Sequence, residues 1–211
     1  ISCALVGTKK DVSPNCYLPA ESPSCLGVAS GEGAVEMGVY RSSPLSLTGS
    51  PPANGWNMRW SSCCRPTTIT NLNNPSSTGY MLRALMFPYI NPVTGLPLTA
   101  NVCYDDSPNF LEDPKVVACS GLDVSYNNLG FDKDLDSLYY DWAVAWDDGN
   151  SFPGSTVSYA TGYSFSSPMP GPTQNSSNKA AVLDNASGQV RFTSFTSGSF
   201  ATCIKIEEWR C

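Results

Sequence analysis

The chain has 211 residues, a formal net charge of −6 at pH 7 and no histidine. A negative chain repels phosphate backbones, so we expect no nucleic-acid partner. Without histidine, the Ser-His-Asp and Cys-His catalytic sites are excluded. No run approaches the roughly 20 apolar residues of a membrane-spanning helix, so we expect no direct insertion into a membrane.

The composition predicts an all-β fold. Gly and Pro each number 17, and charged residues make up only 14% of the chain, a balance rich in turn formers and poor in helix formers. The length suffices for one large or two small β-sandwich domains with a hydrophobic core.

Alternating apolar and polar residues predict four strands. They cover residues 56–62, 80–87, 138–146 and 200–207. In the first, Trp56 and Trp60 share one face, and in the third Trp142 and Trp146 do the same. Shared faces of this kind favour core packing for these tryptophans. An acidic stretch that contains proline, residues 104–114, separates two strand-rich halves, so we expect domains at residues 1–106 and 107–211.

Nine cysteines are more than a reducing compartment usually tolerates. There is no Cys-x-x-Cys pair and no histidine to complete a zinc site, so the thiols predict disulfides and an extracellular location. Because the number is odd, at least one cysteine is free or is paired with a residue outside this sequence. We therefore interpret the chain as a segment of a longer secreted protein. The candidates for disulfide formation are Cys16, Cys25, Cys63, Cys64, Cys103, Cys119, Cys203 and Cys211.

Short separations favour the pairs Cys16–Cys25 and Cys103–Cys119, although sequence alone does not fix connectivity. Neighbouring residues on a strand point to opposite faces. The adjacent cysteines 63 and 64 could therefore hardly bond to each other without distortion, and we expect each of them to bond a different partner.

Asp132, Asp134 and Asp136 stand at every second position just before a predicted strand. Carboxylates spaced in this way can converge on one hard cation, and Ca²⁺ takes roughly six to eight oxygen ligands. The alternative is a solvated acidic turn. An EF-hand fits poorly, because the sixth position of such a loop requires Gly.

The order of motifs along the chain carries a resemblance. The acidic turn D-x-D-x-D-S-L-x-Y is followed by V-x-Y-x-x-G-Y-S at residues 157–164 and by a turn of the L-D-x-x-x-G kind at residues 183–188. These resemble the cadherin-like and Ig-like repeats of bacterial surface proteins. With the upstream VSPNC and WNMRWSSCCRPTTITNL, the chain resembles modules of giant SprB-like adhesins of gliding Bacteroidetes, which are exported by type IX secretion.

This resemblance implies tandem Ig-like or cadherin-like β-sandwiches with disulfides, the first of them truncated at its start. It also implies that Asp105 and Asp106, in the stretch between the two halves, are further candidate ligands for Ca²⁺. Leu135 stands in the acidic turn where the resembled pattern has Gly.

The expected function is a structural and adhesive module of a large secreted adhesin at the outer-membrane surface, which supports attachment and gliding. Its expected partners are neighbouring modules and surface glycans. The alternative is a carbohydrate-binding module, and we do not expect an enzyme. Four aromatic residues are candidates for glycan contact: Tyr139, Tyr159, Tyr163 and Phe165.

Overall fold

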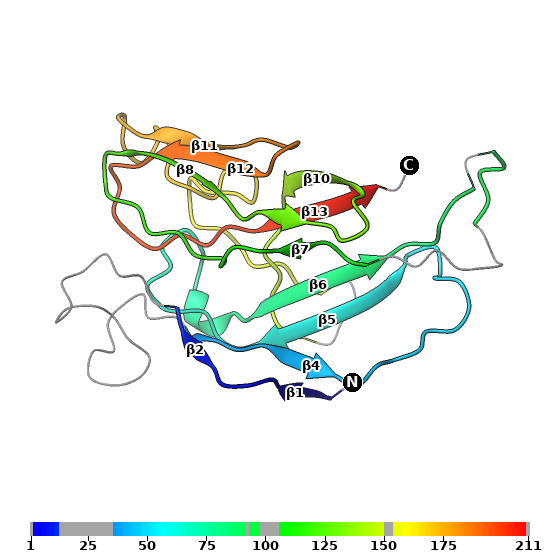
Figure 1. Cartoon of the computed structure of the whole chain (residues 1–211). Coiled ribbons are helices and arrows are strands. Elements are labelled where there is room, and N and C mark those ends of the chain that lie inside the picture. Colours follow the sequence, from blue (N-terminus) through cyan, green and yellow to red (C-terminus); the bar gives the residue numbers. More distant parts are fainter. Residues whose placement is uncertain (1, 13–35, 92, 98–105, 150–153, 210–211) are drawn as a thin grey trace. The chain divides into compact units, whose positions relative to one another are not determined.

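The computed structural model describes residues 2–12, 36–91, 93–97, 106–149 and 154–209 (Figure 1). The chain is nearly all β, which confirms the predicted fold class. Among the described residues, the helical structure is one 3-10 turn, η1 (Pro75–Ser77). Backbone contacts divide the chain into two compact units, Ile1–Gly49 and Ser50–Cys211.

The first unit contains two short antiparallel pairs. The strands are β1 (Cys3–Leu5), β2 (Lys10–Asp11), β3 (Glu36–Met37) and β4 (Tyr40–Ser42). β1 pairs with β4, and β2 pairs with β3. An ion pair of 2.8 Å between Lys9 and Glu36 supports the second pair. Cys16 and Cys25 lie outside the described residues, so their predicted bond stays a prediction.

The second unit holds the remaining described strands, all in antiparallel pairings. They are β5 (Trp56–Ser62), β6 (Tyr80–Met86), β7 (Asn109–Phe110), β8 (Asp123–Asn127), β9 (Gly130–Phe131), β10 (Ser137–Trp142), β11 (Lys179–Leu183), β12 (Gln189–Thr193) and β13 (Ile204–Trp209). β5 pairs with β6, β7 with β9 and β10 with β13, while β11, β12 and β8 form a three-stranded sheet. The predicted strand at residues 56–62 has the observed bounds, and the other three predictions overlap β6, β10 and β13.

The main core of this unit lies between the three-stranded sheet and the β10–β13 pair (Figure 1). Val190 and Phe192 alternate with the exposed Arg191 along β12, as expected for a strand with one buried face. They pack with Tyr140 of β10 and Leu183 of β11. Two packed layers of strands fit the general β-sandwich arrangement, while the tandem arrangement of two sandwiches stays a prediction.

A second cluster joins parts of the chain that are far apart in sequence. Leu72, Ala145 and Val157 are buried together, and the Arg65 guanidinium donates to the carbonyl of Trp146 at 3.0 Å. The predicted boundary between residues 106 and 107 therefore falls inside the second unit, and direct contacts join its two sides.

The two faces of the β5–β6 pair differ in burial. Met81 is buried, and the Arg83 guanidinium lies 5.1 Å from the centre of the Trp146 ring. On the opposite face Trp60 is 46% exposed and Leu82 is 66% exposed. The expected core position is wrong for Trp60, because period-2 alternation shows which residues share a face and not which face is covered. Trp56, Trp142 and Trp146 are half-buried.

Candidate metal centre

The acidic loop of residues 132–136 joins β9 to β10 and is anchored in a strand pair at each end. Before it, Phe131 pairs with Asn109 of β7. After it, Ser137 pairs with Trp209 of β13. Two fixed ends restrict the loop to few conformations, which holds its side chains in place.

The structure brings the three predicted carboxylates together. One carboxylate oxygen from each of Asp132, Asp134 and Asp136 lies within 4.8 Å of the others. Asp132 is buried, Asp136 is half-buried and Asp134 is exposed, so the cluster opens from the interior toward solvent. Three negative groups at this separation repel one another unless a cation lies between them.

Asp132 is 3% exposed, and its two oxygens differ in their surroundings. Oδ1 accepts a hydrogen bond of 3.0 Å from the Asp136 amide. Oδ2 is buried and has no hydrogen-bond partner among the described residues. A buried carboxylate oxygen without a partner is costly. The donor set therefore fits a hard divalent cation, which would supply the missing interaction.

Leu135 gives the loop the backbone that the resembled pattern obtains from Gly. Its φ is 64°, in the left-handed region that side chains disfavour. The side chain is 83% exposed, so it makes little packing contact in return. The tight turn that brings the Asp136 amide to Asp132 is thus kept, although the residue is not Gly.

Asp106 reaches the loop through two contacts. Its amide donates to Asp134 Oδ2 at 2.9 Å, and its own carboxylate forms an ion pair of 2.7 Å with Lys133. The hydrogen bond to Asp106 raises the pKa of Lys133 above its ordinary value. Asp106 thus lies beside the cluster with its carboxylate directed to Lys133. Asp105 lies outside the described residues.

Lys133 was not among the predicted site residues. Its position inside the acidic motif gave no signal of its own, because a lysine there could equally extend into solvent. Only the structure shows that it contacts Asp106, which is 27 residues away in sequence.

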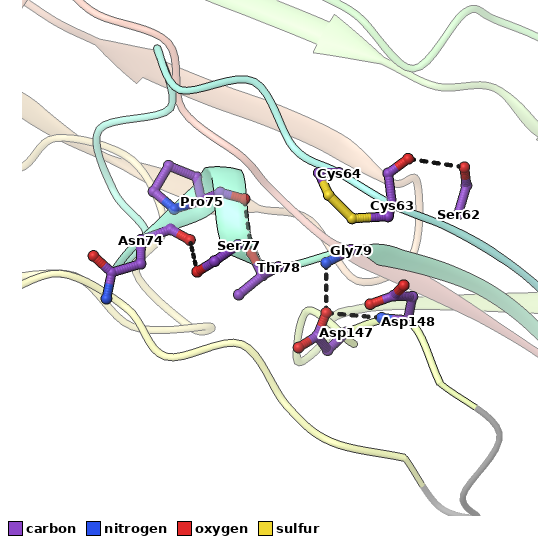
Figure 2. The surroundings of a disulfide bond; sticks show 10 residues. All are labelled: Ser62, Cys63, Cys64, Asn74, Pro75, Ser77, Thr78, Gly79, Asp147 and Asp148. Carbon is purple, nitrogen blue, oxygen red and sulfur yellow. Dashed lines mark hydrogen bonds between the residues drawn. A yellow bond between two sulfur atoms is a disulfide. The ribbon is translucent and has the colours of Figure 1, made fainter.

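Figure 2 shows a disulfide between the adjacent cysteines 63 and 64, so the expectation of different partners is wrong. That expectation assumed an extended strand with trans peptide bonds, in which neighbouring side chains diverge. β5 ends at Ser62, however, and the peptide bond between the two cysteines is cis, with the Cα atoms 3.1 Å apart. The bond has a sequence separation of one, so it links no distant segments.

The surroundings of this disulfide are polar (Figure 2). The Ser62 hydroxyl donates to the Cys63 carbonyl at 3.1 Å, and the Gly79 amide donates to the Asp147 carboxylate. The other described candidates, Cys119 and Cys203, are free thiols, and burial raises the pKa of Cys203. The remaining candidates lie outside the described residues: Cys16, Cys25, Cys103 and Cys211. Of these, Cys103 is the predicted partner of Cys119.

The four candidates for glycan contact fall into two groups. Tyr139 and Phe165 are 43% and 45% exposed. Tyr159 packs against the second core cluster, and the Tyr163 ring lies 6.1 Å from that of Phe200. Burial raises the pKa of both of these tyrosines. Two of the four residues are thus engaged in packing, which leaves Tyr139 and Phe165 accessible.

Comparison of the chain with protein-family models, curated proteins and solved structures finds no match. In the described part of the chain, no helix has the length and apolar character that a membrane crossing requires. The fold and the site together define a nearly all-β protein with a cluster of three carboxylates in the loop between two strands.

Proposed function

We propose that this chain is a structural and adhesive module of a large secreted adhesin at the outer-membrane surface, stiffened by Ca²⁺ and active in attachment and gliding. One observation carries the calcium part: Asp132 lies beside two further carboxylates, and its buried Oδ2 has no hydrogen-bond partner within the described residues. The order of sequence motifs supports the adhesin part.

The chemistry of the cluster favours Ca²⁺ over Mg²⁺. Ca²⁺ accepts carboxylates, backbone carbonyls and water in a flexible arrangement, whereas Mg²⁺ demands a near-ideal octahedron and gives up its water reluctantly. Asp132, Asp134 and Asp136 would hold the ion, and water would complete its coordination. The ion would offset the repulsion among the three carboxylates and the burial of Asp132.

A bound ion would stiffen the second unit through the strands on either side of the loop. β9 is paired with β7, and β10 is paired with β13, so a ligand at the junction of β9 and β10 restrains both pairs. Binding to the folded state alone stabilises it by mass action. A module in a surface filament benefits from such stiffness, and the accessible Tyr139 and Phe165 would serve contacts with surface glycans.

The test is urea unfolding of the wild-type chain and of Asp132→Asn, each in millimolar calcium and in EGTA. Calcium should stabilise the wild type by about 1–3 kcal/mol and leave the variant unchanged. In EGTA the variant should be at least as stable as the wild type, because it lacks the buried charge.

The matched control is Asp113→Asn, which changes an exposed acid outside the cluster and should keep the full calcium response. Wild-type unfolding curves that coincide in calcium and in EGTA would refute the calcium part of the proposal.

A further inference from the structure

Asp134 takes part in two interactions. Its carboxylate belongs to the cluster with Asp132 and Asp136, and its Oδ2 accepts the hydrogen bond from the Asp106 amide at 2.9 Å. The binding of a metal ion can therefore affect the backbone of Asp106 through the side chain of Asp134.

The segment that follows Asp106 runs antiparallel to the segment that leads into the acidic loop. The pairing of β7 with β9 continues in two backbone hydrogen bonds, from the Leu111 amide to the Leu129 carbonyl at 2.9 Å and from the Glu112 amide to the Asn128 carbonyl at 3.2 Å. On the other side of β7, Asp106 contacts Asp134 and Lys133. Among the described residues, these contacts with side chains of the acidic loop take the place of backbone pairing at this end of the ladder.

These side chains are exposed, which limits what they contribute without a metal ion. Lys133 and Asp106 are 74% and 51% exposed at their side chains, and an exposed ion pair contributes little stability. Without a cation, Asp134 is repelled by its two neighbours in the cluster, which favours rotamers that turn it away from the Asp106 amide.

We infer that calcium binding strengthens the contacts of Asp106 with Asp134 and Lys133, which together we call the clasp. The ion holds the Asp134 carboxylate in place, and the two contacts then attach Asp106 to the acidic loop. The inference rests on the calcium site of the proposed function. An ion that fixes the Asp134 carboxylate orients the acceptor for the Asp106 amide before the bond forms, so the bond costs less entropy. Asp106 is then a positioning residue that couples the segment before β7 to the site.

The test is amide hydrogen exchange of the full chain by NMR, in calcium and in EGTA. Exchange at the Asp106 amide should slow about tenfold in calcium, because its hydrogen bond to the charged Asp134 carboxylate is then broken less often. The Ser187 amide is the internal control, since it also donates to a carboxylate, that of Asp184, at 2.8 Å. Equal slowing at both amides would mean a global effect and would overturn the inference.

Lys133→Gln breaks the ion pair and keeps all three carboxylates of the cluster. Calorimetry should still show calcium binding, while the slowing at Asp106 should fall about two- to fivefold. Lys179→Gln, which breaks the exposed ion pair of 2.9 Å with Asp123, should leave it unchanged. If calcium slows exchange at the Asp106 amide as much in Lys133→Gln as in the wild type, Lys133 is not part of the clasp.

The two proposals fail separately. If calorimetry detects no calcium binding to the wild type, the proposed function fails. If calcium binds and the Asp106 amide exchanges at the same rate in calcium and in EGTA, only the clasp is refuted.

Discussion

Asn71 and Asp132 are both polar side chains in the interior of the second unit, with 0% and 3% of their surface exposed. Asn71 donates from Nδ2 to the carbonyls of Pro168 and Ala201, each at 2.7 Å. Its Oδ1 accepts from the Ala201 amide at 2.9 Å. Protein groups thus satisfy both ends of the amide.

Asp132 differs in one oxygen. Its Oδ1 is bonded to the Asp136 amide, and its Oδ2 has no partner in the part of the chain that the structure describes. A buried polar group that is fully paired fixes the fold, whereas one that is buried and incompletely paired needs a ligand or costs stability. The two residues therefore differ in role, although both are buried.

Replacement of Asn71 gives the largest expected effect. Asn71→Ala removes three hydrogen bonds, which pair the buried Pro168 carbonyl and the half-buried backbone groups of Ala201. The free energy of unfolding should fall by about 3–5 kcal/mol, equally in calcium and in EGTA. Urea unfolding measures this loss.

Asn73→Ala is the matched control. Its side chain is exposed and donates to the Tyr159 carbonyl at 2.9 Å, so the loss should be about 1 kcal/mol or less. A loss at Asn71 as small as that at Asn73 would contradict the structural role of Asn71. A loss of unfolding free energy that differs between calcium and EGTA would contradict the difference in role between Asn71 and Asp132.

Local sequence patterns predicted the features that local geometry determines. Alternation placed β5 at residues 56–62, because side chains of a strand must alternate between its faces. Spacing alone grouped Asp132, Asp134 and Asp136, since residues two apart in a tight loop lie close together whatever the rest of the chain does.

Features that depend on distant partners could not be predicted in this way. Asn71 stands among polar turn formers, and its partners Pro168 and Ala201 are 97 and 130 residues away. The exposure of Trp60 depends on what covers β5 and not on β5 itself. The bond between cysteines 63 and 64 joins neighbours across a cis peptide bond, which sequence does not reveal outside proline.

Replacement of Leu135 tests how much the left-handed backbone of the acidic loop costs in stability. A left-handed backbone costs a side chain about 1–2 kcal/mol, and Gly avoids this cost while it loses about 0.5–1 kcal/mol of chain entropy. Because Leu135 is 83% exposed, Leu135→Gly should stabilise the protein by about 0.5–1 kcal/mol and keep the calcium response.

The control is Leu111→Gly. Leu111 is 64% exposed and is not among the residues with a positive φ, so Gly there should destabilise the protein. Thermal melting distinguishes the two variants by sign. If both variants were destabilised, the positive φ of Leu135 would not lower the stability of the protein.

Asp184 gives the smallest expected effect and shows what an acidic turn alone does. Its carboxylate accepts from the amide and the hydroxyl of Ser187, each at 2.8 Å, and from the Ala186 amide at 3.1 Å. These hydrogen bonds, the Ser187 amide first, lower the pKa of Asp184 below its ordinary value. The folded state thus favours the ionised carboxylate.

The sign of the pH effect follows from this shift. A carboxyl group with a depressed pKa stabilises the folded state above the ordinary pKa of about 3.9 and loses that contribution as the pH falls through its folded pKa. Between about pH 5 and about pH 3, the melting temperature of the wild type should therefore fall slightly more than that of Asp184→Asn. Equal falls would contradict the assignment. Calcium should change neither result, because N–H and O–H donors already pair the Asp184 carboxylate, whereas in the acidic loop two further carboxylates lie close to that of Asp132.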